Sequence, residues 1–197
     1  VAIGAFYAAL RSELEHRARK LHEWRGDHHL ARDYDLVSIS RSSRPLPVLP
    51  DATFALDATR YFVEIDRATV RLDAWEERIC AFQAYAKSAQ IQQRYGVDSF
   101  VVLVVVPNAA RVAAIVRTIA STLGGPSPMY RFMVQDHVHP LTIRRRWQQM
   151  GEVSWRPRRL PKGGLAQEAV VTMIDAPPLW LPQTGDQGAA EMASSGG

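Results

Sequence analysis

The chain of 197 residues has very little cysteine and no long apolar run, and each absence excludes a class of protein. Its single cysteine, Cys80, excludes both a disulfide framework and a cysteine-rich zinc site. No apolar stretch reaches the roughly 18 residues that a membrane-spanning helix needs, so we expect no membrane association. No basic segment leads into an apolar secretion signal, and we therefore expect a cytoplasmic protein.

Acidic residues are fewer than basic ones, with 20 Asp and Glu against 24 Lys and Arg, which leaves a net charge of +4. All but three of the basic residues are arginine. The 47% hydrophobic and 22% charged fractions are typical of a globular domain with a substantial core. The positive balance favours an anionic partner.

The pattern of apolar residues predicts a mixed α/β order. It predicts helices over residues 3–21, 72–94 and 109–123, and strands over residues 36–39, 53–56, 61–65, 100–106 and 130–134. Residues 40–50 hold three prolines and predict an extended linker. The run 100–106 is apolar throughout, as in a central strand covered on both faces. We therefore expect a three-layer α/β domain.

Composition divides the chain into three parts. Residues 1–140 form the expected α/β core, and residues 141–181 form a basic extension that we expect to pack on it. Residues 182–197 are rich in Gly, Ala, Ser and Gln, a composition that predicts a disordered tail.

Within the basic extension, residues 144–162 combine seven positive charges with two tryptophans and one acid, Glu152. Its candidate DNA-binding residues are Arg144, Arg145, Arg146, Trp147, Trp155, Arg156, Arg158, Arg159 and Lys162. Cationic side chains pair with phosphates, and exposed indoles stack on unpaired bases. The alternative is an ordinary solvated basic surface whose tryptophans pack inward. We favour the nucleic-acid contact.

Three carboxylates form the most informative cluster. Glu64 and Asp66 are two residues apart on an expected strand and so share one face, and a neighbouring strand that begins at Asp51 would bring a third carboxylate to them. Converging carboxylates of this kind are the oxygen ligands that Mg²⁺ or Mn²⁺ prefers. The alternative is a solvated face on which Glu64 and Asp66 pair with Arg67 or Arg71.

Five motifs in order resemble the replication-relaxation family of plasmid and mobile-element proteins, which includes relaxases of the MobC kind. They are Pro50-Asp51, the run FVEIDRAT at 62–69, RICAFQAY at 78–85, RYGVDSFVVL at 94–103, and Arg111. The resemblance covers residues 9–123 and implies a core like the PD-(D/E)XK restriction-endonuclease fold, with a mixed central sheet flanked by helices.

The resemblance also implies roles for individual residues. Asp51 matches the aspartate of the PD motif and Glu64 the second acid, while Asp66 agrees with the family's own Glu-x-Asp pattern. Trp24 matches a tryptophan that closes the family's first helix, and Asp27 then corresponds to a fourth metal contact. The implied metal ligands are Asp51, Glu64, Asp66 and Asp27.

The resemblance has one departure, at Arg78, where the family usually carries a lysine. An arginine stabilises phosphate charge but holds its proton too tightly to exchange it. The implied catalytic set is therefore Asp51, Glu64, Asp66 and Arg78.

Two functions follow from this resemblance. The first is metal-dependent nicking or cleavage of DNA, with Mg²⁺ or Mn²⁺ as cofactor, favoured by the three acids. The second is an inactive DNA-binding or protein-docking accessory with the same fold, favoured by Arg78. DNA is the expected partner in both, together with plasmid replication or transfer proteins. The family typically carries a winged-helix domain ahead of this core. We expect either a truncation or a separate gene to explain why this sequence does not include that domain.

Overall fold

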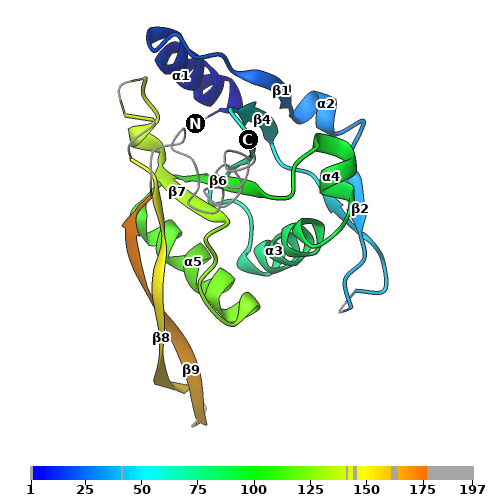
Figure 1. Cartoon of the computed structure of the whole chain (residues 1–197). Coiled ribbons are helices and arrows are strands. Elements are labelled where there is room, and N and C mark those ends of the chain that lie inside the picture. The colour runs from blue at the N-terminus through cyan, green and yellow to red at the C-terminus, as the bar shows by residue number, and fades with distance from the viewer. Residues whose placement is uncertain (1, 41, 141, 144–145, 161–163, 177–197) are drawn as a thin grey trace, which may run out of the picture.

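A seven-stranded mixed sheet forms the centre of the protein in the computed structural model, which describes residues 2–40, 42–140, 142–143, 146–160 and 164–176 (Figure 1). Its order is β1 (His22–Gly26), β4 (Ala52–Leu56), β5 (Thr59–Ile65), β6 (Phe100–Val106), β7 (Tyr130–Val134), β8 (Gln148–Leu160) and β9 (Gly164–Asp175). The pairs β5–β6 and β6–β7 are parallel, and the other neighbouring pairs are antiparallel.

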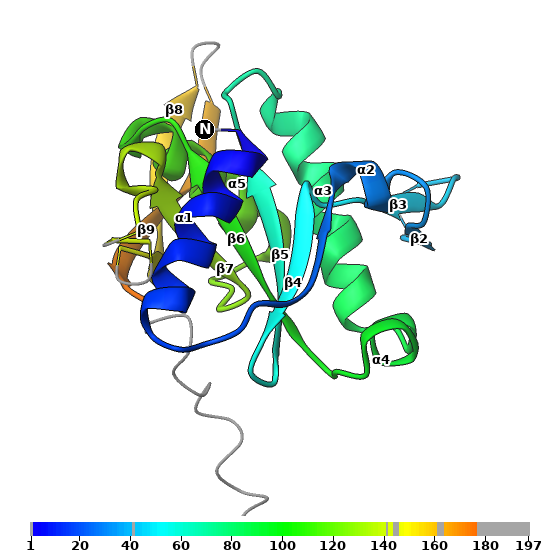
Figure 2. The ribbon, with the colours of Figure 1, turned by 90° about the horizontal axis from the view of Figure 1, so that it is seen from above.

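Helices cover both faces of this sheet, as Figure 2 shows from above. Helix α1 (Ile3–His16) lies on one face, and α3 (Leu72–Ala86) and α5 (Ala109–Leu123) lie on the other. The shorter elements are α2 (Asp27–Leu30), α4 (Gln90–Tyr95), the 3-10 turn Gln135–His137, and a small sheet of β2 (Asp35–Val37) and β3 (Leu46–Val48). The predicted mixed sheet flanked by helices is confirmed.

Strand β6 holds the two halves of the core together. All seven of its residues are buried, with Val102 and Val104 packed beneath α3 and α5 and with Leu103 and Val105 packed beneath α1. A strand covered on both faces needs apolar side chains at every position, which is why its sequence does not alternate. The prediction for residues 100–106 is confirmed.

The first helix is shorter than its periodicity predicts. It ends at His16, Ala18 then adopts a φ of 53°, and residues 22–26 form strand β1 instead of a continued helix. Pairing with β1 gives the backbone groups on the outer side of β4 hydrogen-bond partners. It also places Trp24 against the ring of Phe54, with 5.8 Å between the ring centroids. The predicted role of Trp24 as the end of the first helix is therefore wrong.

The second long helix is interrupted. Helix α3 ends at Ala86, and the hydroxyl of Ser88 donates to the carbonyl of Tyr85 at 2.8 Å before α4 begins. A serine hydroxyl that bonds a backbone carbonyl competes with the helical hydrogen-bond ladder. Gly96 then closes α4 with a φ of 67°, as the sequence predicts.

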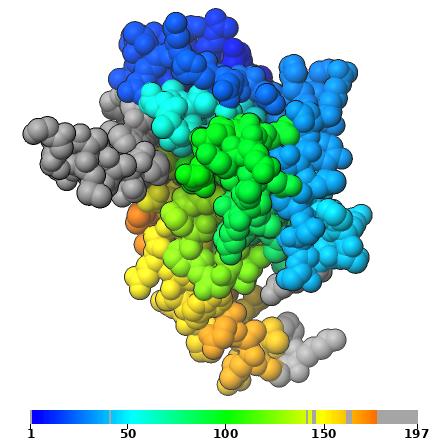
Figure 3. Space-filling view, turned by 45° about the vertical axis from the view of Figure 1, so that its right-hand side comes forward, coloured from blue at the N-terminus to red at the C-terminus, as the bar shows by residue number. Residues whose placement is uncertain are grey.

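Two strands that composition alone does not predict lie in the basic extension. Strand β8 pairs with β7 at its base and with β9 along its whole length. We call residues 153–160 and 164–171 the arm, because this ribbon runs past α5 and projects beyond the core (Figure 1). Figure 3 shows the same region protruding at the lower end of the molecule.

Candidate functional site

The carboxylate cluster lies where β5 ends, under helix α3. Glu64 is buried, with 1% of its surface exposed, and its Oε2 accepts a hydrogen bond from Nη1 of Arg78 at 2.5 Å. The guanidinium of Arg78 also lies 5.4 Å from the ring centre of Trp75, within cation–π range. The predicted neighbourhood of Glu64 and Arg78 is therefore present, as a direct ion pair.

Burial raises the pKa of Glu64 to about 8. The positive charge of Arg78 opposes this rise, and the nearby carboxylates of Asp51 and Asp66 add to it. The second oxygen, Oε1, is buried and has no hydrogen-bond partner among the described residues. Burial of the Glu64 carboxyl therefore lowers the stability of the folded protein, because one of its oxygens has lost water and gained no hydrogen bond from the part of the chain that the structure describes.

Asp66 is buried as well and accepts hydrogen bonds at both oxygens. Oδ1 accepts from the backbone N–H of Ala68 at 2.6 Å. Oδ2 accepts from Nε1 of Trp75 at 3.1 Å and from Nε of Arg111 at 2.7 Å. The guanidinium of Arg111 is held in turn by the carbonyl of Val70.

The shared face of Glu64 and Asp66 is therefore confirmed, but it faces helices and not solvent. The alternative of a solvated face paired with Arg67 or Arg71 is wrong, since Asp66 pairs with Arg111 and Arg71 pairs with Asp73. The parallel strands β5 and β6 have their carboxyl ends at the same end of the sheet, and α5 begins just after β6. This topology brings Arg111 to Asp66.

Asp51 lies at the same end of the sheet and ties β4 to β5. Its Oδ2 accepts from the backbone N–H of Ile65 at 2.7 Å, and its own N–H donates to the carbonyl of Val63 at 2.9 Å. Asp27 is exposed, at the start of α2, and its Oδ1 accepts from the N–H of His28. Gly26 pairs with Ala52, so Asp27 is close to Asp51 in the register of the sheet.

The fit to a divalent cation differs among these residues. Within the part of the chain that the structure describes, no three His, Cys, Asp or Glu side chains lie close enough together to hold a metal ion. Asp66 has both oxygens engaged by other donors, so it does not fit as a ligand. Glu64 fits through its unpartnered Oε1, and Asp51 fits as the neighbouring charge.

The sequence by itself assigns no role to two contributors to this site, Trp75 and Arg111. Trp75 belongs to the apolar stripe of its helix, and nothing local distinguishes it from a core residue that makes no polar contact. The position of Arg111 does indicate a role, because this residue lies in the first turn of the helix that follows β6, and β6 is the parallel neighbour of β5. Side chains at the carboxyl ends of adjacent parallel strands converge.

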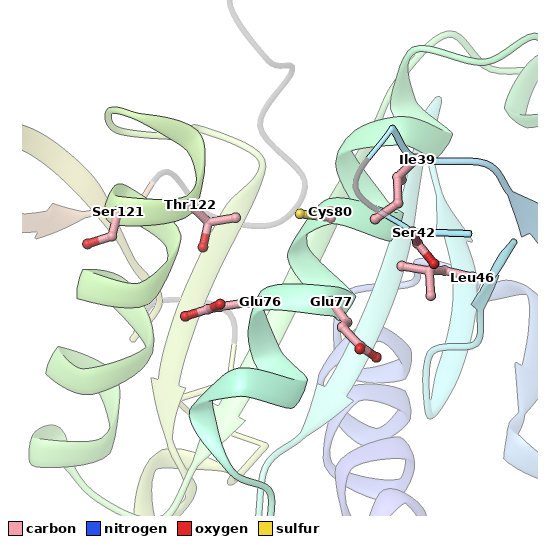
Figure 4. Close-up of a pocket in the computed structure, with 8 residues that line it drawn as sticks. All are labelled: Ile39, Ser42, Leu46, Glu76, Glu77, Cys80, Ser121 and Thr122. Atoms are coloured by element: carbon pink, nitrogen blue, oxygen red, sulfur yellow. The ribbon is translucent and has the colours of Figure 1, made fainter. Parts of the chain in front are cut away.

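A pocket of about 330 Å³ lies between α3, α5 and the loop before β3 (Figure 4). It is lined by Ile39, Ser42, Leu46, Glu76, Glu77, Cys80, Ser121 and Thr122, and Glu76 extends from α3 towards α5. The charged residues in this lining are two glutamates. A phosphate backbone would be repelled there, so this pocket is unsuited to DNA.

The candidate DNA-binding residues are divided between the core and the arm. Trp147 is fully buried, its indole N–H donates to the carbonyl of Ile143 at 2.5 Å, and its ring packs against Phe6. The prediction that Trp147 stacks on bases is therefore wrong, and inward packing is correct for this residue. Arg144, Arg145 and Lys162 lie outside the described residues.

The remaining candidates are exposed. Trp155 is 42% exposed on β8, and Arg156, Arg158 and Arg159 follow it along the same strand towards the distal end of the arm. Arg146 is exposed just before the strand begins. Within the arm, Glu168 is the one acidic residue, opposite Arg156. The arm therefore presents a positive surface that the core does not neutralise.

The fold and this site define a mixed α/β protein with a buried carboxylate cluster paired to arginines and a basic two-stranded arm. The chain belongs to the replication-relaxation family, whose model matches residues 1–101 of the 197. No curated protein and no solved structure matches the chain significantly. Among the described residues, no helix has the length and apolar character to span a membrane.

Proposed function

We propose that this protein binds DNA as an accessory factor in the replication or transfer of a plasmid or mobile element. The basic arm is the observation that carries the proposal. A two-stranded antiparallel ribbon is narrow enough to enter a DNA groove, and exposed arginines pair with phosphates as it does so. Proteins of plasmid replication or transfer are the expected partners, as the family membership supports.

The core supports a binding role more than a catalytic one. The order of α1, the main-sheet strands β1, β4 and β5, helix α3 and strand β6 around Asp51 and Glu64 favours a PD-(D/E)XK-like core. Each of the two buried acids is already paired with an arginine, Glu64 with Arg78 and Asp66 with Arg111. A guanidinium on Glu64 supplies the positive charge that a metal ion would otherwise supply there.

The arm is tested by replacing Arg156, Arg158 and Arg159 with serine. Removing one arginine–phosphate pair reduces the slope of log affinity against log salt by about 0.9. We expect the triple variant to lose up to about 2.7 of that slope and to bind duplex DNA at least roughly tenfold more weakly at moderate salt. Fluorescence anisotropy of labelled duplex over a series of salt concentrations measures both quantities.

The matched control replaces Arg32, Arg67 and Arg117, three exposed arginines outside the arm. It removes the same net charge, so a general loss of attraction would affect both variants equally. We expect the control to keep most of the wild-type salt slope. Equal losses in the two variants, or no DNA binding by the wild type, would contradict the proposal.

The second candidate function is metal-dependent nicking of a phosphodiester, and the unpartnered Oε1 of Glu64 favours it. Asp51 and Glu64 would hold Mg²⁺ or Mn²⁺, which lowers the pKa of bound water and neutralises charge on the phosphate. In this function Arg78 stabilises phosphate charge without moving a proton. Its 37% exposed side chain has room to turn from Glu64 to a phosphate.

A titration of Mn²⁺ separates the two functions. We expect no calorimetric binding to the wild type and no nicking of supercoiled plasmid, because burial keeps the pKa of Glu64 at about 8 and Arg78 already occupies its Oε2. Binding by the wild type that is lost in both Asp51→Asn and Glu64→Gln would establish the metal site and overturn the accessory function. Nicking that survives both substitutions would point to a contaminating nuclease.

A further inference from the structure

The arm exposes large apolar side chains among its arginines, and two of them lie at its distal end. Leu165 is 74% exposed, Leu160 is 45% exposed and Trp155 is 42% exposed. Leu160 pairs with Gly164 and Leu165 lies opposite Arg159, so both leucines lie at the far end of the ribbon. Residues paired across the two strands share a face, so Leu165 lies on the face of Arg159, and Leu160 lies on the opposite face with Arg158.

Large apolar side chains exposed on both faces at the end of a projecting element mark a contact surface. The charge around it decides which partner fits. The arm carries Arg156, Arg158 and Arg159 against the single acid Glu168, so two arms in contact would repel each other. A polyanion with apolar surfaces between its charges fits both features, and duplex DNA has phosphates outside and stacked bases within.

We propose that Leu160 and Leu165, one on each face of the arm's distal end, make this end an apolar wedge that enters the minor groove and opens a base step, so that the arm bends the DNA it binds. This inference rests on the proposed function of the arm in DNA binding. Apolar wedges that partly unstack a base step kink the duplex, and the bent DNA then contacts more protein surface. The arginines beside the leucines hold the phosphates on either side of the kink.

The experiment separates bending from binding on the full chain. A duplex of about 30 bp carries a donor and an acceptor dye at its two ends, so that bending raises the transfer efficiency. The double variant Leu160→Ser with Leu165→Ser is compared with the wild type. The control is Leu36→Ser, since Leu36 is 50% exposed but lies on β2, away from the arm.

We expect the wild type and Leu36→Ser to raise the transfer efficiency on binding. The double variant should lose at least half of that rise while its Kd increases by less than about tenfold, because the phosphate contacts remain. Bending by the double variant equal to the wild type, or binding by the wild type without bending, would overturn the wedge and leave DNA binding intact. Absence of DNA binding by the wild type would overturn both.

Light scattering on the same samples tests whether the exposed leucines instead contact a second copy of the chain. We expect the wild type and the double variant to have the same mass in solution. A wild-type dimer that the two serine substitutions convert to a monomer would show that the leucines meet another arm, and it would overturn the wedge.

Discussion

Replacement of Arg111 by methionine is expected to lower the free energy of unfolding by about 3 kcal/mol or more. Arg111 is 14% exposed and its partner Asp66 is 1% exposed at the side chain, so the substitution leaves a buried carboxylate without its counter-charge. The cost of breaking a buried ion pair exceeds the worth of the pair, because the remaining charge has lost both water and partner. In a chain of this length the melting temperature should fall by about 10 °C.

Urea unfolding of Arg111→Met measures the effect, with Arg117→Met as the control. Arg117 is an exposed residue on the same helix, and the same change there should stay within about 0.5 kcal/mol. Adding Asp66→Asn to Arg111→Met removes the buried charge and should recover part of the loss. Additive effects of the two substitutions would contradict a direct coupling between Arg111 and Asp66.

Replacement of Glu64 by glutamine is expected to make the protein more stable above about pH 8, by up to about 4 kcal/mol, and to leave it nearly unchanged at about pH 5. Burial raises the pKa of Glu64 to about 8 in the folded protein. At low pH the wild-type carboxyl is neutral, as the amide is. At high pH only the wild type holds a buried ionised group at position 64.

The direction of the pH dependence follows from proton binding. Between about pH 4.5 and pH 8 the folded protein keeps the proton on Glu64 while the unfolded chain has released it. Ionisation therefore favours the unfolded chain as the pH rises, and the contribution of Glu64 to stability is lost over that window. Above the folded pKa both states are ionised and the slope ends.

Urea midpoints of the wild type and of Glu64→Gln across this pH range measure the difference. Glu77→Gln is the control, because Glu77 is exposed on α3 one residue before Arg78 and should follow the wild-type profile. A constant difference between Glu64→Gln and the wild type at all pH values would contradict the burial of an ionisable carboxyl at this position.

These two predictions concern the same feature, a pair of acids that the fold buries at a cost. A protein that needed only stability would carry apolar residues at both positions. Arg78 comes from α3 and Arg111 from α5, so the two ion pairs join both helices to the carboxyl ends of the central strands. The cluster therefore couples the packing of these helices to the charge of Glu64 and Asp66.

Elements with a local signal were predictable from the sequence. The unbroken run at Phe100–Val106 indicated a strand buried on both faces, and the helix Ala109–Leu123 followed from its periodicity. Where two structures compete for one segment, periodicity alone does not decide. The helical pattern extends to residue 21, yet the helix ends at His16, and residues 22–26 form a strand that pairs with β4.

The sequence by itself determined the residues of the carboxylate cluster, the shared face of Glu64 and Asp66 and the mixed α/β class, because strand periodicity and motif order are local properties. Only the tertiary structure decided that this face is buried, that Arg78 and Arg111 pair with the two acids, and that Trp147 packs inward while Trp155 is exposed. Burial and pairing depend on which distant elements cover a strand. That information belongs to the sheet order and the crossing helices, and no window of neighbouring residues contains it.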